Sequence, residues 1–151
     1  MAKNLLIIYH SQSGNNKKLA DACLEGCKKE AVETVLKKAV DVELEDILSC
    51  KALIIVSPEY FGYMAGAIKD FFDRTYYPAR DRNINLPYAL IIGCGNDGTG
   101  AERGIETLAT GYVLKKTLET LIVKEDELNK GLTKAQELGQ TFAAGIDLGI
   151  F

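Results

Sequence analysis

The sequence contains no tryptophan, one histidine, three prolines and no Cys-x-x-Cys motif. Any flat ligand must therefore be held by tyrosine or phenylalanine rather than by tryptophan. With His10 as its one histidine, the chain offers no structural zinc site. No apolar run is long enough to span a bilayer, and the apolar run at the amino terminus is too short for a signal peptide. We therefore expect a cytoplasmic protein that does not insert into a membrane.

Strong charge of either sign is also missing. The net charge of −3 argues against nucleic acid or an anionic membrane as the partner. Hydrophobic residues make up 47% of the 151 residues and charged residues 26%, which is typical of a globular protein. Length and composition together predict a single domain covering residues 1–151.

The four cysteines, Cys23, Cys27, Cys50 and Cys94, do not form a recognisable framework. Cys23 and Cys27 lie four residues apart in a helical pattern and share a face with Leu19. They could be a redox pair, but free cysteine is commonly buried, and we favour small buried side chains.

Apolar and amphipathic segments alternate along the chain. Short apolar or alternating runs predict five strands, at Leu5–Tyr9, Ala31–Val40, Ala52–Val56, Tyr88–Ile92 and Leu118–Val123. Helical patterns follow each strand, ending near Lys29 after the first strand and then covering Leu44–Ser49, Ile68–Tyr76, Glu102–Lys116 and Thr133–Ile146. A polar connection is expected at Tyr77–Asn83. This alternation predicts a doubly wound α/β fold, with a parallel sheet covered by helices on both faces.

The strand order can be argued from how apolar each strand is. The first, third and fourth strands are solidly apolar, which indicates central positions. The second alternates and contains Lys37 and Lys38, and the fifth is short with charged flanks, so both suit an edge. The order 2-1-3-4-5 satisfies these constraints. Ligands of such sheets bind beyond the carboxyl ends of the strands, where the order reverses between strands one and three.

The turn after the first strand, Ser11-Gln12-Ser13-Gly14-Asn15-Asn16, has hydroxyls, amides, a glycine and no acid. It leads into a helix, whose exposed N–H groups and dipole favour an anion such as phosphate. The alternative is an ordinary helix cap by Ser13 or Asn15.

The stretch Ser57–Gly66 follows the third strand and is unusual for a turn. It combines Pro58 and two glycines with Tyr60, Phe61, Tyr63 and Met64. Aromatic side chains on a shaped loop at the carboxyl end of a buried strand suggest a slot for a flat ligand. Simple packing against neighbouring loops is the alternative.

Several other motifs are weak or absent. Gly93–Gly98 matches Gly-x-Gly-x-x-Gly, but it follows the fourth strand and is a weak dinucleotide fingerprint. A response-regulator receiver would need acids where Tyr9, His10 and Ser57 stand. A thiol phosphatase would need arginine in place of Gly100, six residues after Cys94. A serine hydrolase would need Gly-x-Ser-x-Gly and a histidine partner, and the chain lacks the motif.

The hydroxyl-rich turn and the segment Ser57–Thr75, with its Ser-Pro-Glu-Tyr-Phe-Gly-Tyr-Met and Phe-Phe-Asp-Arg motifs, resemble the flavodoxin-like FMN proteins. They are similar in particular to the NAD(P)H-dependent FMN and quinone reductases, including the tryptophan-repressor-binding-protein group. The resemblance implies a flavodoxin-like fold of the short-chain form. It also implies FMN as cofactor, NADH or NADPH as electron donor and a small acceptor such as a quinone.

The resemblance also implies which residues bind FMN. The phosphate would be held by Ser11, Gln12, Ser13, Gly14, Asn15 and Asn16. The ring would be bordered by Pro58, Glu59, Tyr60, Phe61 and Gly62, and the third loop would be Cys94, Gly95, Asn96 and Asp97. Asn16 departs from the threonine common in the family, so the phosphate loses one hydroxyl donor. No long insertion interrupts the fifth strand and the tetramer-forming insertions are missing, so the oligomeric state, a homodimer included, stays open.

The same site suits an electron-carrier flavodoxin, and a flavin-regulated interaction module is a further alternative. Hydride transfer needs no acid–base pair because the cofactor supplies the chemistry, so no catalytic residue is assigned. Four arginines could meet a nicotinamide phosphate, but solvated surface charge is the favoured interpretation for Arg74, Arg80, Arg82 and Arg103. His10 is interpreted as a polar loop residue.

Overall fold

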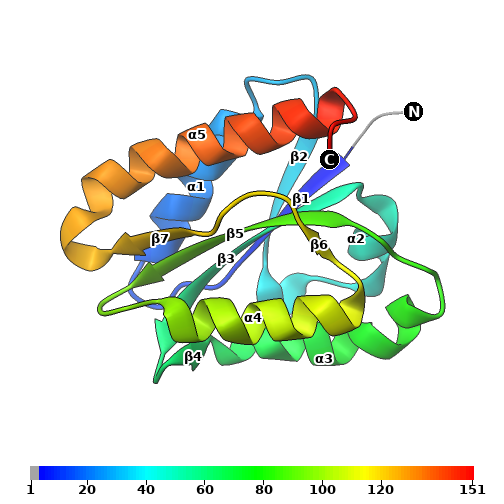
Figure 1. Ribbon diagram of the computed structural model, residues 1–151, viewed down its shortest axis with the longest axis horizontal. Coiled ribbons are helices and arrows are strands. Elements are labelled where there is room, and N and C mark those ends of the chain that lie inside the picture. The colour runs from blue at the N-terminus through cyan, green and yellow to red at the C-terminus, as the bar shows by residue number, and fades with distance from the viewer. Residues whose placement is uncertain (1–3) are drawn as a thin grey trace.

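The computed structural model describes residues 4–151, which form one sheet between two layers of helices (Figure 1). The strands of this part of the chain are β1 (Asn4–Tyr9), β2 (Glu33–Lys38), β3 (Ala52–Tyr60), β4 (Tyr63–Met64), β5 (Pro87–Cys94), β6 (Lys115–Lys116) and β7 (Leu121–Lys124). The α-helices are α1 (Asn15–Cys27), α2 (Leu44–Ser49), α3 (Gly66–Arg80), α4 (Thr99–Tyr112) and α5 (Leu128–Asp147). Two 3-10 turns are η1 (Ala39–Asp41) and η2 (Glu125–Glu127).

The strand order is β2-β1-β3-β5, and β6 and β7 both pair with β5 at the far edge. All of these pairs are parallel, while the short β4 runs antiparallel to β3. Because β5 is the fourth main strand and β6 and β7 together form the fifth, the predicted order 2-1-3-4-5 is confirmed. The lysines of β2 lie at the sheet edge, as expected.

Alternating side chains of the central strands fill two separate cores. Leu5 and Ile7 of β1 pack with α1 and α5, whereas Leu6 and Ile8 pack with α2, α3 and α4 on the other face. All four side chains are at most 3% exposed. A strand buried on both faces reads as an unbroken apolar run, which is why the central strands could be predicted.

The helices α1 and α5 lie side by side on one face and approach each other through glycines (Figure 1). A Cβ atom on Gly26 would lie 1.9 Å from the Gln136 carbonyl oxygen, and one on Gly139 would lie 2.2 Å from the Cys23 carbonyl oxygen. The Cys27 thiol donates to the Gly139 carbonyl at 3.4 Å. Cys23 and Cys27 are free and fully buried, which confirms their interpretation as small buried side chains.

The helix predicted over Glu102–Lys116 is wrong at its carboxyl end. The helix α4 ends at Tyr112 because Val113 adopts a left-handed conformation, with φ of 67°. The Leu114 N–H then donates to the Ala109 carbonyl at 2.8 Å, and the buried Leu114 side chain returns the chain to the core. The next two residues form β6 instead of a last helical turn.

Other boundaries also differ from the prediction, and the second strand is shorter than expected, Glu33–Lys38, with Ala39–Asp41 forming η1. The segment expected as a polar connection from Tyr77 continues α3 to Arg80, with Pro78 inside the last turn. There the missing proline N–H costs only one helical hydrogen bond, to the Arg74 carbonyl. The main part of the fifth strand begins at Leu121, and the last helix begins at Leu128.

Within residues 4–151 no helix combines the length and apolar character needed to cross a bilayer.

Candidate functional site

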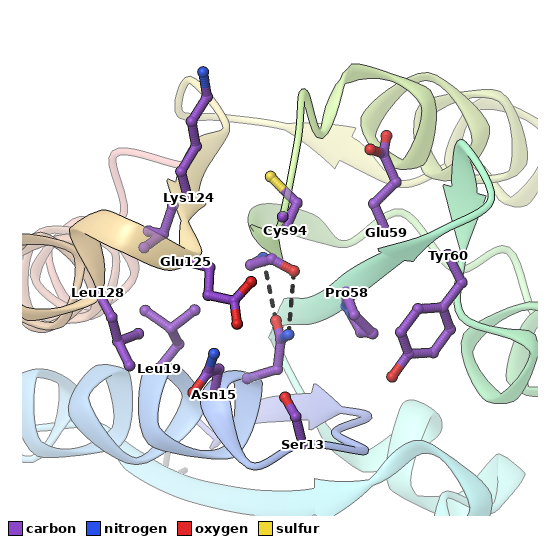
Figure 2. A pocket seen from close by; sticks show the side chains of 14 residues that line it. Ser13, Asn15, Leu19, Pro58, Glu59, Tyr60, Cys94, Lys124, Glu125 and Leu128 are labelled. Atoms are coloured by element: carbon purple, nitrogen blue, oxygen red, sulfur yellow. Dashed lines mark hydrogen bonds between the residues drawn. The ribbon is translucent and has the colours of Figure 1, made fainter.

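The carboxyl ends of β1, β3, β5 and β7 surround a hollow of about 120 Å³, called the pocket below (Figure 2). Eight of the predicted site residues line it: Ser13, Asn15, Asn16, Pro58, Glu59, Tyr60, Cys94 and Gly95. The other seven, Ser11, Gln12, Gly14, Phe61, Gly62, Asn96 and Asp97, belong to the same three loops but lie outside the lining. The strand order therefore brings the three predicted loops together.

The first loop presents the amino terminus of α1. Its cap residue is Gly14, whose φ of 101° suits glycine, and no side chain in the described chain caps this helix. The Gly14 N–H donates to the Ser11 hydroxyl at 3.1 Å, which tightens the turn. Capping by Ser13 or Asn15 is therefore wrong. With no acid in the first helical turn, its N–H groups are available to an anion.

Asn16 joins the first loop to the third. Its side-chain amide donates to the Gly93 carbonyl at 3.2 Å and accepts the Gly93 N–H at 3.1 Å, drawn as dashed lines in Figure 2. The side chain is 5% exposed. A Cβ atom on Gly93 would lie 2.7 Å from the Asn16 side-chain oxygen, so glycine is needed for this close approach. The side-chain amide of Asn16 is thus committed to the protein, and its backbone N–H, in the first turn of α1, is the group that an anion at this terminus would meet.

Changing Asn16 to leucine should therefore destabilise the protein. Leucine fills a similar volume but leaves a buried N–H and a buried carbonyl of Gly93 without partners, and each such group costs about 1–3 kcal/mol. We expect a loss of at least about 2 kcal/mol in unfolding free energy and a melting temperature roughly 4–8 °C lower. Thermal unfolding followed by circular dichroism measures this. Asn129→Leu, on the exposed start of α5, is the control; equal melting temperatures for the two variants would contradict the role of Asn16.

The second loop is a hairpin rather than an irregular turn. The strand β3 continues to Tyr60 and pairs with β4 across a two-residue turn, Phe61–Gly62. Both turn residues have positive φ, 54° and 72°, as a type I′ turn requires. Phe61 is fully exposed at the tip. At the base, the Ser57 hydroxyl accepts the Ala65 N–H at 3.3 Å. The sequence suggested a shaped loop but did not reveal the pairing, because an aromatic residue is unusual at the first turn position.

Tyr60 leans from this hairpin toward the first loop. In Figure 2 its side chain points toward Ser13, whereas Glu59 points away. Its ring meets His10 edge-on, with ring centroids 6.1 Å apart. Partial burial raises the pKa of the Tyr60 phenol, and a hydrogen bond with the Gln12 backbone opposes that rise. Tyr60 therefore lies between the first two loops and connects the predicted phosphate end of the pocket to the predicted ring end.

Glu59 connects the hairpin to the third loop. Its carboxylate accepts the N–H groups of Gly98 at 3.0 Å, Gly100 at 2.9 Å and Ala101 at 3.1 Å. These groups belong to the start of α4, so the protein's own carboxylate fills that helix terminus. The Gly-x-Gly-x-x-Gly pattern therefore serves an internal contact here, and the pyrophosphate of a dinucleotide has no open terminus at this helix.

The third loop provides an inert thiol and an exposed polar rim. Burial, and then the nearby Glu59 carboxylate, raise the pKa of the Cys94 thiol, so it remains protonated at neutral pH. Asp97 accepts a hydrogen bond from the Thr99 hydroxyl. Gly95, Asn96 and Asp97 are exposed beside the pocket.

A fourth segment of the site was missed from the sequence. At the end of β7 and just after it, Val123, Lys124, Glu125 and Leu128 line the pocket. The Glu125 side chain points into the hollow and Lys124 points out of it (Figure 2). The topology rule that joined the first three loops applies equally to the loop after the fifth strand, so this signal was available.

Three of the four arginines considered are not placed to meet a ligand in the pocket, because they are bonded to other parts of the protein or lie away from it. Arg74 donates to Asp70 at 2.7 Å and to the carbonyls of Val42 and Ala39 at 2.8 Å and 2.9 Å, which fastens α3 to η1. Arg80 is the last residue of α3 and Arg82 follows the helix, whereas the pocket adjoins the strand ends from which α3 departs. Arg103 is exposed in the first turns of α4.

Comparison with known sequences decides the family. The sequence model described as NADPH-dependent FMN reductase matches residues 35–128. The chain belongs to this family. Its match begins in β2 and includes the hairpin, the third loop and the segment after β7.

Further similarities were found to one curated sequence, of which this chain covers little more than a third, and to solved structures. A flavodoxin from Aquifex aeolicus (strain VF5) is 36% identical over 70 residues, which cover 46% of this chain and 38% of that protein. A flavodoxin from the domain Archaea has a TM-score of 0.81 at 20% identity, covering 95% of this chain and 99% of that one. A flavodoxin, WrbA-like protein from Agrobacterium tumefaciens has a TM-score of 0.79 at 18% identity, covering 95% and 96%. The fold is flavodoxin-like.

The residues present fit FMN, the cofactor of this family. Open N–H groups of α1 face one end of the pocket, where they suit a phosphate. The tyrosine, proline and backbone of the hairpin border the other end and suit a flat ring. Space for close approach is present, since nothing lies within 4 Å of a Cβ atom placed on Gly14 or Gly62.

Proposed function

We propose that the protein is an oxidoreductase that passes electrons from NADH or NADPH through FMN to a small acceptor such as a quinone. The observation that supports this most is the pocket at the three predicted loops in a chain of the NADPH-dependent FMN reductase family. Bound FMN would accept a hydride and release electrons singly or in pairs. The contribution of the protein is to bind, orient and shield the cofactor.

The roles of the chain's own groups follow from the geometry. The N–H groups at the start of α1 would bind the phosphate, with Asn16 holding that terminus against β5. Tyr60 and Pro58 would border the ring, and the protonated Cys94 thiol would present a neutral surface to it. The exposed tip at Phe61 offers an apolar edge where a flat donor or acceptor could stack.

A second candidate is an electron carrier between redox proteins. Carriers use acidic surfaces near the flavin to steer partners, and the structure places the exposed acids Glu125, Asp126 and Glu127 beside the pocket. Two lysines in the first turns of α1 and α3 already have acidic partners, Lys17 with Asp21 at 2.6 Å and Lys69 with Asp73 at 2.6 Å. This group of acids would favour the docking of a basic partner.

Two measurements on one preparation test the proposal. FMN titrated with the protein should lose its fluorescence at micromolar concentrations, and a folded protein that leaves the fluorescence unchanged would rule out the site. The holoprotein is then mixed anaerobically with NADPH or NADH in a stopped-flow instrument. Rapid bleaching of the flavin without a long-lived semiquinone is expected of the reductase. If neither nicotinamide bleaches the flavin and dithionite accumulates a stable semiquinone, the carrier is the correct assignment.

A further inference from the structure

The contact between the hairpin and α4 is unusually specific for two surface elements. Both oxygens of the Glu59 carboxylate are used, one by the Gly98 N–H and the other by the N–H groups of Gly100 and Ala101. Both side-chain positions at this helix terminus must accept hydrogen bonds, because backbone N–H groups face each of them. A glutamine would place its NH2 group at one of these positions, where an N–H would face an N–H. The interaction therefore requires the charged carboxylate.

The same contact fixes the position of the hairpin tip. A Cβ atom on Gly100 would lie 2.0 Å from the Gly62 carbonyl oxygen, so the turn rests directly on the first turn of α4. One turn later, a Cβ atom on Gly104 would lie 2.7 Å from the Tyr63 ring. Glu59 is the charged side chain of the hairpin that accepts these N–H groups, and its carboxylate attracts the positive end of the α4 dipole. Without this carboxylate, the contact of the tip with α4 would depend on van der Waals packing at Gly100 and Gly104.

We propose that Glu59 is a positioning residue, whose carboxylate fastens the Phe61–Gly62 tip to α4 and so sets the ring end of the flavin pocket. It acts through the hairpin backbone and leaves the first loop unchanged. The proposal builds on the FMN binding that underlies the proposed function, but it does not depend on which donor reduces the flavin. Its prediction is a loss of affinity for the ring of the cofactor and not for the phosphate.

Comparing FMN with riboflavin, which lacks the phosphate, tests this point. Glu59→Gln should weaken both ligands by a similar factor of about 10- to 100-fold, the equivalent of one hydrogen bond to a charged group. The circular dichroism bands of the bound flavin should change as well, because they report the surroundings of the ring. Glu43→Gln, which alters a carboxylate that caps α2 away from the pocket, is the matched control and should leave both affinities unchanged.

Two further readouts keep the test decisive if a variant is less stable. In the protein without FMN, Glu59→Gln should speed amide hydrogen exchange at residues 98–101 and in the hairpin together, while exchange at the start of α1 stays constant. Glu59→Ala should regain flavin affinity when acetate is added but not when chloride of equal ionic strength is added.

The proposal is overturned if Glu59→Gln binds riboflavin as tightly as the wild type, or if only FMN is weakened. It is equally overturned if hairpin exchange is unaffected. Failure of the nicotinamide reaction, with these binding results intact, would remove the reductase assignment and leave the role of Glu59 standing.

Discussion

Replacing Gly100 with valine is expected to weaken FMN binding by about 10- to 100-fold while most of the fold persists. The new side chain would enter the 2.0 Å gap to the Gly62 carbonyl oxygen, and backbone atoms cannot rotate out of its way. The hairpin must therefore lift from α4, which breaks the hydrogen bonds to Glu59 as well. Overpacking of this kind costs about 1–3 kcal/mol. Because FMN binding would require the hairpin to return to its place against α4, we expect the affinity for FMN to fall by a similar free energy.

Fluorescence titration with FMN measures this change, and thermal unfolding shows whether the fold persists. Gly111→Ala is the matched control because it lies in the same helix, where a Cβ atom would meet nothing within 4 Å. It should leave FMN binding unchanged and stabilise α4 by up to about 1 kcal/mol. An unchanged FMN affinity in Gly100→Val would show that the hairpin does not define the pocket.

Replacing Gly26 with valine is expected to cause the largest loss of stability. Its Cβ atom would lie 1.9 Å from the Gln136 carbonyl oxygen, so α1 and α5 would have to separate along their contact. A Cβ atom on the neighbouring Gly139 would lie 2.2 Å from the Cys23 carbonyl oxygen, so the two helix backbones are in close contact at a second place as well. We expect a loss of about 3 kcal/mol, at the upper end for an overpacked core, and a melting temperature roughly 6–12 °C lower.

Chemical denaturation provides the check, with Gly111→Ala again as the control. The slope of free energy against denaturant should stay constant if only the native packing is affected. A variant as stable as the wild type would mean that the two helices are not packed this closely in solution.

The fold could be predicted from the sequence because its strongest signals are local. Runs such as Ala52–Val56 are long enough to identify central strands, and the lysines of β2 identify an edge. The end of α4 could not be predicted in the same way. It depends on Val113 adopting a left-handed conformation so that Leu114 can reach the core, and a β-branched residue gives no warning of that.

The site shows the same division between local and distant information. Proximity of the three loops followed from strand order, and the composition of the turn after β1 indicated an uncapped helix start that suits an anion. The uses of Asn16 and Glu59 were not, because each is determined by backbone groups far away in the sequence, at Gly93 and at the start of α4. A side chain expected to face a ligand can instead be hydrogen-bonded to the protein backbone, and only the three-dimensional structure shows which side chains are used in this way.

The divided strand at the far edge of the sheet has a consequence for how the chain behaves at high concentration. Between β6 and β7 the pairing with β5 is interrupted, and both short strands contain lysine. At the opposite edge β2 also ends in lysines. Long flat edges recruit strands from other molecules, whereas short, charged and broken ones do not. Self-association by strand addition, the usual first step toward fibrils, is therefore disfavoured at both edges.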